Sequence, residues 1–321
     1  AMRLTSVFKR APPSQHLVQN SAQNLDQSPY RSVPEEARRS QTQLEQEFIW
    51  TERDFVRVQT LIYQRAGISL HDGKRAMVYS RLSRRLRHTG HTRFSDYLDW
   101  LQASDSTAGA DNEWQHFVNA LTTNLTSFFR EPHHFTLLAE HLRSKPAGRH
   151  WRIWCSAAST GEEPYSIAMT AVEARGEDAP MTLLASDIDS RVLAKAVAGV
   201  YRADQLKGIS VERMRRVLLR GKGSNEGMVR VKPELQRLLE FQNINLVKDD
   251  WPFALRLSEP LDVVFCRNVM IYFDVSTQRK VLERMHQVLA PGGLLIAGHA
   301  ENFSEARDLF TLQGKTVYVR R

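Results

Sequence analysis

The sequence lacks long apolar runs, and it has only two cysteines among its 321 residues. No stretch approaches the roughly 18 consecutive apolar residues that a membrane-spanning helix needs, so we expect no insertion into a membrane. The first residues lack the apolar segment of a signal peptide, which predicts a cytoplasmic protein. Cys155 and Cys266 have no partners at metal-ligand spacing. Two buried thiols and no metal are therefore expected.

The chain has an excess of positive charge. Its net charge is +8 and its pI is near 9.6, which implies an acidic partner surface. Between Lys74 and Arg93 there are seven Lys and Arg residues and no acid. Four basic side chains in this run are spaced to share one face of a helix: Arg81, Arg84, Arg85 and His88. Nucleic acid is the generic partner of such a face, but no aromatic stacking platform and no RNA-binding module accompany it.

The first half of the chain divides by composition and periodicity. Residues 1–45 are rich in Gln, Ser, Asn, Arg and Pro and poor in large apolar residues, so we expect a disordered tail. Residues 46–145 carry apolar side chains at helical spacing, which predicts an all-helical domain. A capping-box pattern at Thr51 and Asp54 opens its first helix, and Gly67 is a typical stop.

The second half alternates strand and helix patterns. Residues 146–321 therefore predict a doubly wound, mostly parallel sheet with helices on both faces. Residues 202–240 interrupt this alternation with an amphipathic helix, a glycine-rich turn and a short strand at 228–231. We interpret them as a small α/β insertion.

Acidic and amide side chains follow the predicted strands, where open α/β sheets bind their ligands. After the strand at 151–155, small residues would let a ligand approach the backbone, and Glu162 and Glu163 open the next helix. Acids there repel phosphate and suit a cationic group such as an α-ammonium, unless they only compensate the helix dipole. Asp187 ends the next strand, where nucleoside-binding folds hold ribose hydroxyls, and Asp189 could be a helix cap.

Two further strand ends complete this pattern. Asn245 could read an adenine edge or serve in a local turn. Arg267, Asn268 and Tyr272 follow the buried strand at 261–266 at once. A nucleoside joined to a cationic amino acid, with no phosphate site, describes S-adenosylmethionine.

Three longer motifs resemble the chemotaxis receptor methyltransferases of the CheR family. They are residues 122–130 (TTNLTSFFR), 158–166 (ASTGEEPYS) and 265–273 (FCRNVMIYF). The resemblance extends from about residue 48 to the C-terminus. It implies a class I methyltransferase-like fold and transfer of a methyl group from S-adenosylmethionine to chemoreceptor glutamates in chemotaxis adaptation. Glutamyl methyl esters and S-adenosylhomocysteine would be the products.

The resemblance also implies site residues. Nine positions would line the cofactor site: Asn124, Thr126, Arg130, Glu162, Asp187, Asn245, Leu246, Arg267 and Asn268. Whether Arg267 or Asn268 contacts the cofactor directly is left open. Arg130 and Tyr272 would lie near the reacting methyl. A glutamate side chain is already ionised at pH 7 and needs no general base, so we expect these two residues to act by positioning.

The partners follow from the same resemblance. The acidic methylation helices of a receptor would meet the basic face, and a receptor C-terminal peptide would add a strand to an edge of the insertion. The glycine-rich segment 220–230 is similar to that of family members tethered in this way. Two other functions stay open: an RNA methyltransferase, indicated by charge alone, and a non-catalytic scaffold that docks partners through its tail.

Overall fold

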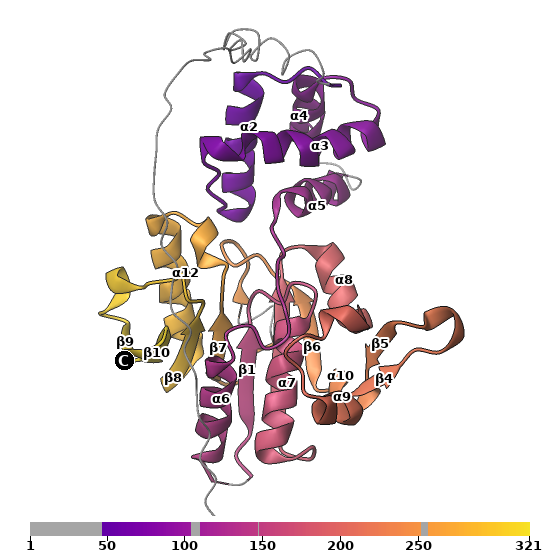
Figure 1. The fold of residues 1–321 in the computed structure, drawn as a ribbon. Coiled ribbons are helices and arrows are strands. Elements are labelled where there is room, and N and C mark those ends of the chain that lie inside the picture. The colour runs from indigo at the N-terminus through magenta and orange to yellow at the C-terminus, as the bar shows by residue number, and fades with distance from the viewer. Residues whose placement is uncertain (1–46, 104–109, 147, 252–255) are drawn as a thin grey trace, which may run out of the picture. The chain divides into compact units, whose positions relative to one another are not determined.

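The computed structural model describes residues 47–103, 110–146, 148–251 and 256–321 (Figure 1). The expected disordered tail, residues 1–45, lies outside the described residues. Residues 47–321 form one unit. Within the described ranges, no helix is both long enough and apolar enough to cross a membrane.

The N-terminal part of this unit is helical, as predicted. It contains α2 (Glu52–Ala66), η1 (Asp72–Lys74), α3 (Arg75–Thr89), α4 (Phe94–Ala103) and α5 (Ala110–Leu121). The Thr51–Asp54 capping box is present, and Gly67 ends α2 in the left-handed conformation that favours glycine. Phe55, Leu82 and Phe94 lie in the shared core of these helices.

A seven-stranded sheet forms the second part, in the order β6-β2-β1-β7-β8-β10-β9. The strands are β1 (Trp151–Cys155), β2 (Met181–Asp187), β6 (Leu239–Asn243), β7 (Leu261–Cys266), β8 (Leu289–Ala297), β9 (Phe310–Gly314) and β10 (Val317–Arg320). Strands β6, β2, β1, β7 and β8 pair in parallel, and β10 is antiparallel to both of its neighbours. The mostly parallel sheet is confirmed, while β9 is an edge strand that the sequence analysis missed.

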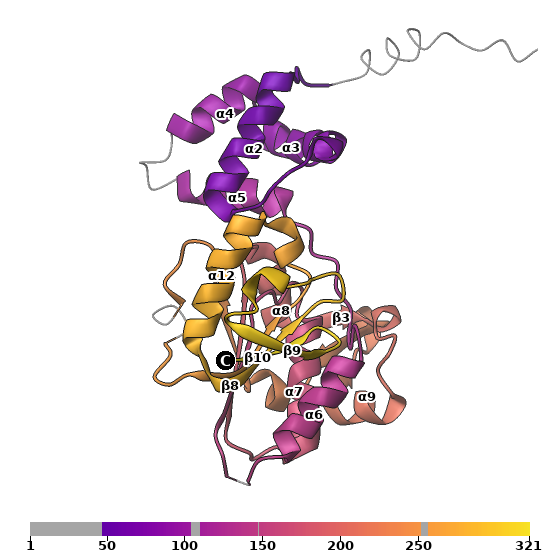
Figure 2. The same cartoon turned by 90° about the vertical axis from the view of Figure 1, so that its left-hand side faces the viewer.

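Helices cover both faces of the sheet. Alternate residues of β7 enter two different hydrophobic clusters, Val263 and Phe265 in one and Val264 and Cys266 in the other. The first cluster includes α6 (His133–Arg143) and α7 (Glu162–Arg175), and the second includes α12 (Val275–Val288). Figure 2 shows α12 on one side of the C-terminal strands and α6 and α7 on the other. A strand buried on both faces is expected to be apolar throughout.

The position of α6 differs from our expectation. We placed the boundary between the two domains near residue 145, which assigns this helix to the helical domain. Instead, Phe135 and Leu138 of α6 share a hydrophobic cluster with Trp151 and Ile153 of β1. Because periodicity shows which face of a helix is apolar but not what covers it, the sequence did not reveal this packing.

The insertion folds as a small antiparallel sheet with short helices. It contains β3 (Val200–Arg202), α9 (Val211–Val217), β4 (Leu218–Arg220), β5 (Met228–Val231) and α10 (Pro233–Gln236), with the strand order β3-β5-β4. The helix α8 (Ser190–Ala198) precedes it. Figure 1 shows the β4–β5 hairpin projecting away from the main sheet.

Candidate cofactor and substrate site

A cavity of about 380 Å³ lies where β1, β2 and β7 end. This is the edge at which open α/β sheets bind ligands, and the volume lies within the roughly 300–1,000 Å³ typical of ligand pockets. The predicted residues that line it are Asn124, Thr126, Arg130, Asp187, Asn245, Leu246, Arg267, Asn268 and Tyr272. These side chains come from segments up to 148 positions apart in the sequence (272 − 124 = 148), and the fold brings them to one cavity.

Asp187 is the buried carboxylate of the cavity. Its side chain is only 8% exposed, and it accepts hydrogen bonds from the backbone N–H groups of Ser159 at 2.8 Å and Asp189 at 2.9 Å. Burial raises the pKa of Asp187 to about 6, although these hydrogen bonds oppose the rise. An ionised carboxylate has about four acceptor sites, so two backbone donors leave capacity for hydroxyl groups of a ligand.

Asp189 has a different role. It is the N-cap of α8, as the sequence allowed, and it also accepts a hydrogen bond from the Asn124 amide at 2.9 Å. The main-chain oxygen of Asn124 accepts from the Ser159 hydroxyl at 2.8 Å. The segment that carries Asn124 is therefore fixed to the ends of β1 and β2.

The two acids that open α7 are placed differently. Glu163 lines the cavity, whereas Glu162 is not among the described residues that do so. The Glu162 carboxylate is 5% exposed and accepts a hydrogen bond from the Thr160 hydroxyl at 2.6 Å. Sequence spacing could not distinguish these neighbours, because consecutive residues at a helix start point in directions about 100° apart.

Arg130 lies in a strained segment. Its neighbours Phe129 and Glu131 have φ angles of +51° and +57°, which non-glycine residues rarely adopt. The Phe129 N–H donates to the Ser166 hydroxyl at 3.0 Å. The Arg130 guanidinium donates to the Leu125 main-chain oxygen at 3.0 Å, and its side chain is 30% exposed at the cavity. Strain of this kind persists where surrounding contacts hold the backbone, and it is common at functional sites.

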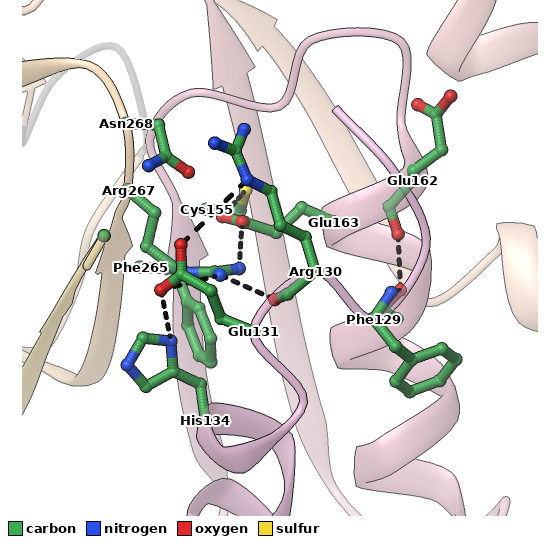
Figure 3. Close-up of polar contacts among 12 residues, drawn as sticks. Phe129, Arg130, Glu131, His134, Cys155, Glu162, Glu163, Phe265, Arg267 and Asn268 are labelled. Carbon is green, nitrogen blue, oxygen red and sulfur yellow. Dashed lines mark hydrogen bonds and ion pairs between the residues drawn. The ribbon is translucent and has the colours of Figure 1, made fainter. Parts of the chain in front are cut away.

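Arg267, which lines the cavity, supplies some of those contacts (Figure 3). Its side chain is fully buried, and it pairs with Glu163 at 2.6 Å and with Glu131 at 3.3 Å. It also donates to the Arg130 main-chain oxygen at 2.6 Å. Burial would raise the pKa of Glu131, but hydrogen bonds from His299 and the charge of Arg267 lower it to about 2. Burial outweighs Arg267 at Glu163, whose pKa is raised.

Glu301 is a site residue that the sequence analysis missed. Its buried carboxylate accepts hydrogen bonds from the backbone N–H groups of Asn268, Val269, Met270 and Gly298. Burial raises the pKa of Glu301, and the four N–H donors oppose that rise. The sequence signal that could have revealed Glu301 was an acidic residue shortly after the strand β8.

The loop that Glu301 holds carries two polar side chains of the cavity. Asn268 has a φ of +59°, and both Asn268 and Tyr272 line the cavity. Among the described residues, neither the Asn268 amide nor the Tyr272 hydroxyl has a hydrogen-bond partner. Arg267 is engaged within the protein, so Asn268 is the better placed of the pair to meet a ligand.

The Asn245 amide is engaged within the protein. Its oxygen accepts from the Val247 N–H at 3.0 Å, and its nitrogen donates to the Arg65 main-chain oxygen at 2.6 Å. The turn thus ties the end of β6 to α2. Each of these two amide atoms makes one hydrogen bond, which leaves one N–H and one lone pair. Asn245 and Leu246 both line the cavity, and the reading of an adenine edge by Asn245 stays a prediction.

The basic face of α3 is only partly exposed. Arg81 donates to the Thr122 main-chain oxygen at 2.7 Å, and Arg85 forms a bidentate pair with Glu113. Arg84 and His88 are exposed. Helical spacing placed the four side chains on one side of the helix, but it could not show that two of them bind acceptors on α5 and on the residue that follows it.

Comparison with known proteins gives a family for the whole described unit. The model "CheR methyltransferase, all-alpha domain" matches residues 53–122, and "CheR methyltransferase, SAM binding domain" matches residues 124–319. The second match begins before α6, in agreement with the packing of that helix on the sheet.

Named relatives are similar over most of their length. A chemotaxis protein methyltransferase of Klebsiella aerogenes is 51% identical over 277 residues, which is 86% of this chain and 92% of the relative. That of Escherichia coli is 49% identical over 279 residues, covering 86% and 94%. Chemotaxis protein methyltransferase 2 of Pseudomonas aeruginosa is 51% identical over 276 residues, covering 85% and 95%. With both family models matched in order and the site residues gathered at the sheet edge, the chain belongs to the CheR family of S-adenosylmethionine-dependent methyltransferases.

Proposed function

We propose that the protein transfers a methyl group from S-adenosylmethionine to glutamate carboxylates of chemoreceptors and forms glutamyl methyl esters. The observation that carries this proposal is the gathering, in one cavity, of nine residues that the family resemblance implies. The cavity joins the sheet edge to the helical part, since His71, Lys74 and Met77 line it too. A ligand at the sheet edge and a substrate at the helical face can therefore meet there.

The cavity residues fit the chemistry of S-adenosylmethionine. Asp187 offers a buried carboxylate for ribose hydroxyls, and Asn268 offers its side-chain amide. Glu163 lines the cavity and is paired with Arg267, and the neighbouring Glu162 adds an acidic group that suits an α-ammonium. The rest of the cavity wall includes Asn124, Thr126, Asn245 and Leu246.

The reaction needs positioning more than acid–base chemistry. When bound, S-adenosylmethionine supplies an electrophilic methyl group on a sulfonium. The acceptor glutamate is ionised at neutral pH, so the protein has to place it in line and replace its water shell with fixed dipoles. Arg130, held between two strained residues, orients the carboxylate, and the Tyr272 hydroxyl donates to it or orients Arg130.

The receptor side of the proposal rests on charge. Arg84 and His88 are exposed on α3, and Lys74 at the start of this helix lines the cavity. The acidic methylation helices of a receptor would be attracted to these positive charges and so brought to the cavity. Arg81 and Arg85 belong to the proposal only as the internal anchors that orient α3.

A second contact is proposed at the insertion. β4 pairs only with β5 in the described sheet, so its other edge is available for a receptor C-terminal peptide to add a strand. Gly221 allows the tight β4–β5 connection, because an added Cβ would lie 2.0 Å from the Asn225 main-chain oxygen. Docking here would raise the local concentration of methylation helices without touching the cavity.

We also propose that the two domains meet near residue 123, not near residue 145.

The test is transfer of radiolabelled methyl from S-adenosylmethionine to receptor-containing membranes, measured as methanol released by base. Carboxyl methyl esters hydrolyse in alkali and methylated bases do not, so the assay separates this function from RNA methylation. Receptors truncated at the C-terminal peptide should be methylated more slowly by the wild-type chain. Cofactor binding without methanol release would refute the proposed substrate, and loss of both would favour a non-catalytic scaffold.

A further inference from the structure

Two large aliphatic side chains are exposed at the cavity. Leu125 is 82% exposed and Ile271 is 48% exposed, and both line the cavity. Leu125 lies between α5 and α6, and Ile271 lies in the loop after β7. Single exposed aliphatic residues are ordinary, but two from separate segments beside one cavity form a local apolar rim.

The rim is rigid. The Leu125 main-chain oxygen accepts from Arg130 at 3.0 Å, and the preceding residue, Asn124, is tied to Ser159. Ile271 lies within a 3-10 turn, and the next residue, Tyr272, accepts from the Ser69 N–H at 2.8 Å. A backbone that is already held loses little conformational entropy when a partner covers the rim, so more of the free energy of apolar burial remains for binding.

Cationic side chains lie beside this rim. Arg130 and the exposed Lys74 both line the cavity, and among the described residues Lys74 has no ion-pair partner. The opening thus combines positive charge with exposed apolar surface. The complementary ligand is a carboxylate with apolar neighbours on the same face.

We propose that Leu125 and Ile271 bind apolar side chains of the receptor helix that lie one helical turn from the acceptor glutamate, and so select which glutamates are methylated. Residues three and four positions apart share a helix face, so the neighbours of a glutamate that enters the cavity lie over its rim. This inference rests on the proposed function and adds the sequence context of its substrate.

The first test is Leu125→Gln and Ile271→Gln, assayed on membranes whose receptors lack the C-terminal peptide, so that docking at the insertion does not contribute. Each variant should raise KM for the receptor about tenfold, equivalent to about 1.4 kcal/mol. Its kcat and its affinity for S-adenosylhomocysteine should stay at wild-type values. Co-sedimentation with the membranes should weaken by the same factor, which is a readout independent of turnover. Leu312→Gln is the matched control, because Leu312 is 56% exposed on β9 and does not line the cavity.

The second test changes the substrate. Aspartate placed three or four residues from an acceptor glutamate should slow methylation of that glutamate by the wild-type chain, and should slow it less in Leu125→Gln. Unchanged KM and co-sedimentation in both rim variants would refute the inference while leaving the proposed function intact. Loss of S-adenosylhomocysteine binding would also refute it, because the rim would then belong to the cofactor site. Absence of methanol release by the wild-type chain would instead refute the proposed function.

Discussion

The clearest prediction separates two neighbouring arginines of α3. Both Nε and Nη2 of Arg85 donate to the Glu113 carboxylate, which also accepts from the Tyr97 hydroxyl at 2.8 Å. The side chains of Arg85 and Glu113 are 15% and 7% exposed. Removing one partner of a buried pair leaves an uncompensated charge and costs about 3–5 kcal/mol. Because Arg85 keeps some contact with solvent, we expect Arg85→Glu to lower the free energy of unfolding by about 3 kcal/mol.

Arg84 provides the contrast. Its side chain is exposed, so Arg84→Glu should change the free energy of unfolding by no more than about 0.5 kcal/mol. The reversed charge should instead slow receptor methylation at low ionic strength, and added salt should narrow the difference from the wild type. Cofactor affinity should not change, because Arg84 does not line the cavity.

Urea denaturation and the methanol-release assay distinguish the two variants. A loss of about 3 kcal/mol in Arg85→Glu corresponds to roughly 6–12 °C in Tm for a domain of this size. Arg85→Met is a second variant that removes the pair without adding a negative charge, and it should also be destabilised. Equal stability of the Arg84 and Arg85 variants would refute the assignment of Arg85 as an internal anchor. Wild-type methylation by Arg84→Glu at low salt would refute the receptor-binding role of Arg84.

Three further predictions concern the cavity. The pKa of Asp187 is raised to about 6. If only its ionised form binds the ribose, the affinity for S-adenosylhomocysteine should fall about tenfold from pH 7 to pH 5. Calorimetry should show that the affinity of Asp187→Asn does not change with pH. In Glu301→Gln, buried backbone N–H groups would face an amide donor, so the free energy of unfolding should fall by about 1–3 kcal/mol. Single-turnover methylation, measured at saturating cofactor, should also be slower. Tyr272→Phe should slow turnover about tenfold with no change in cofactor affinity, and unchanged turnover would exclude its hydroxyl from the reaction.

Local features of the fold could be predicted from the sequence. The Thr51 capping box, the strand at 228–231 and the polar strand ends depend on neighbours in the chain, so short patterns reveal them. The parallel sheet then brings Asp187 and Asn268 to one edge, because strands of one direction end on the same side. A helix or strand pattern was enough for these inferences, and no tertiary contact had to be known.

Features that depend on distant contacts could not be predicted. Arg85 is separated from Glu113 by 28 positions, and Asn245 is separated from Arg65 by 180. Glu301 acts on a loop more than 30 positions earlier, through backbone groups that no side-chain pattern marks. The sequence shows which hydrogen bonds a side chain can form, but only the fold shows whether its partner is a ligand or another part of the protein.

The buried charges beneath the cavity illustrate this distinction. A buried arginine between two carboxylates is weak support for stability, because desolvation offsets much of the attraction. Arg267 also binds the main-chain oxygen of Arg130, however, and its partner Glu131 is one of the two strained residues beside Arg130. The network therefore holds a backbone conformation that would otherwise relax, and it orients Arg130 toward the cavity before any ligand arrives. A site that works by placing an already ionised nucleophile needs that orientation in advance, since no proton transfer is required to compensate for a misplaced carboxylate.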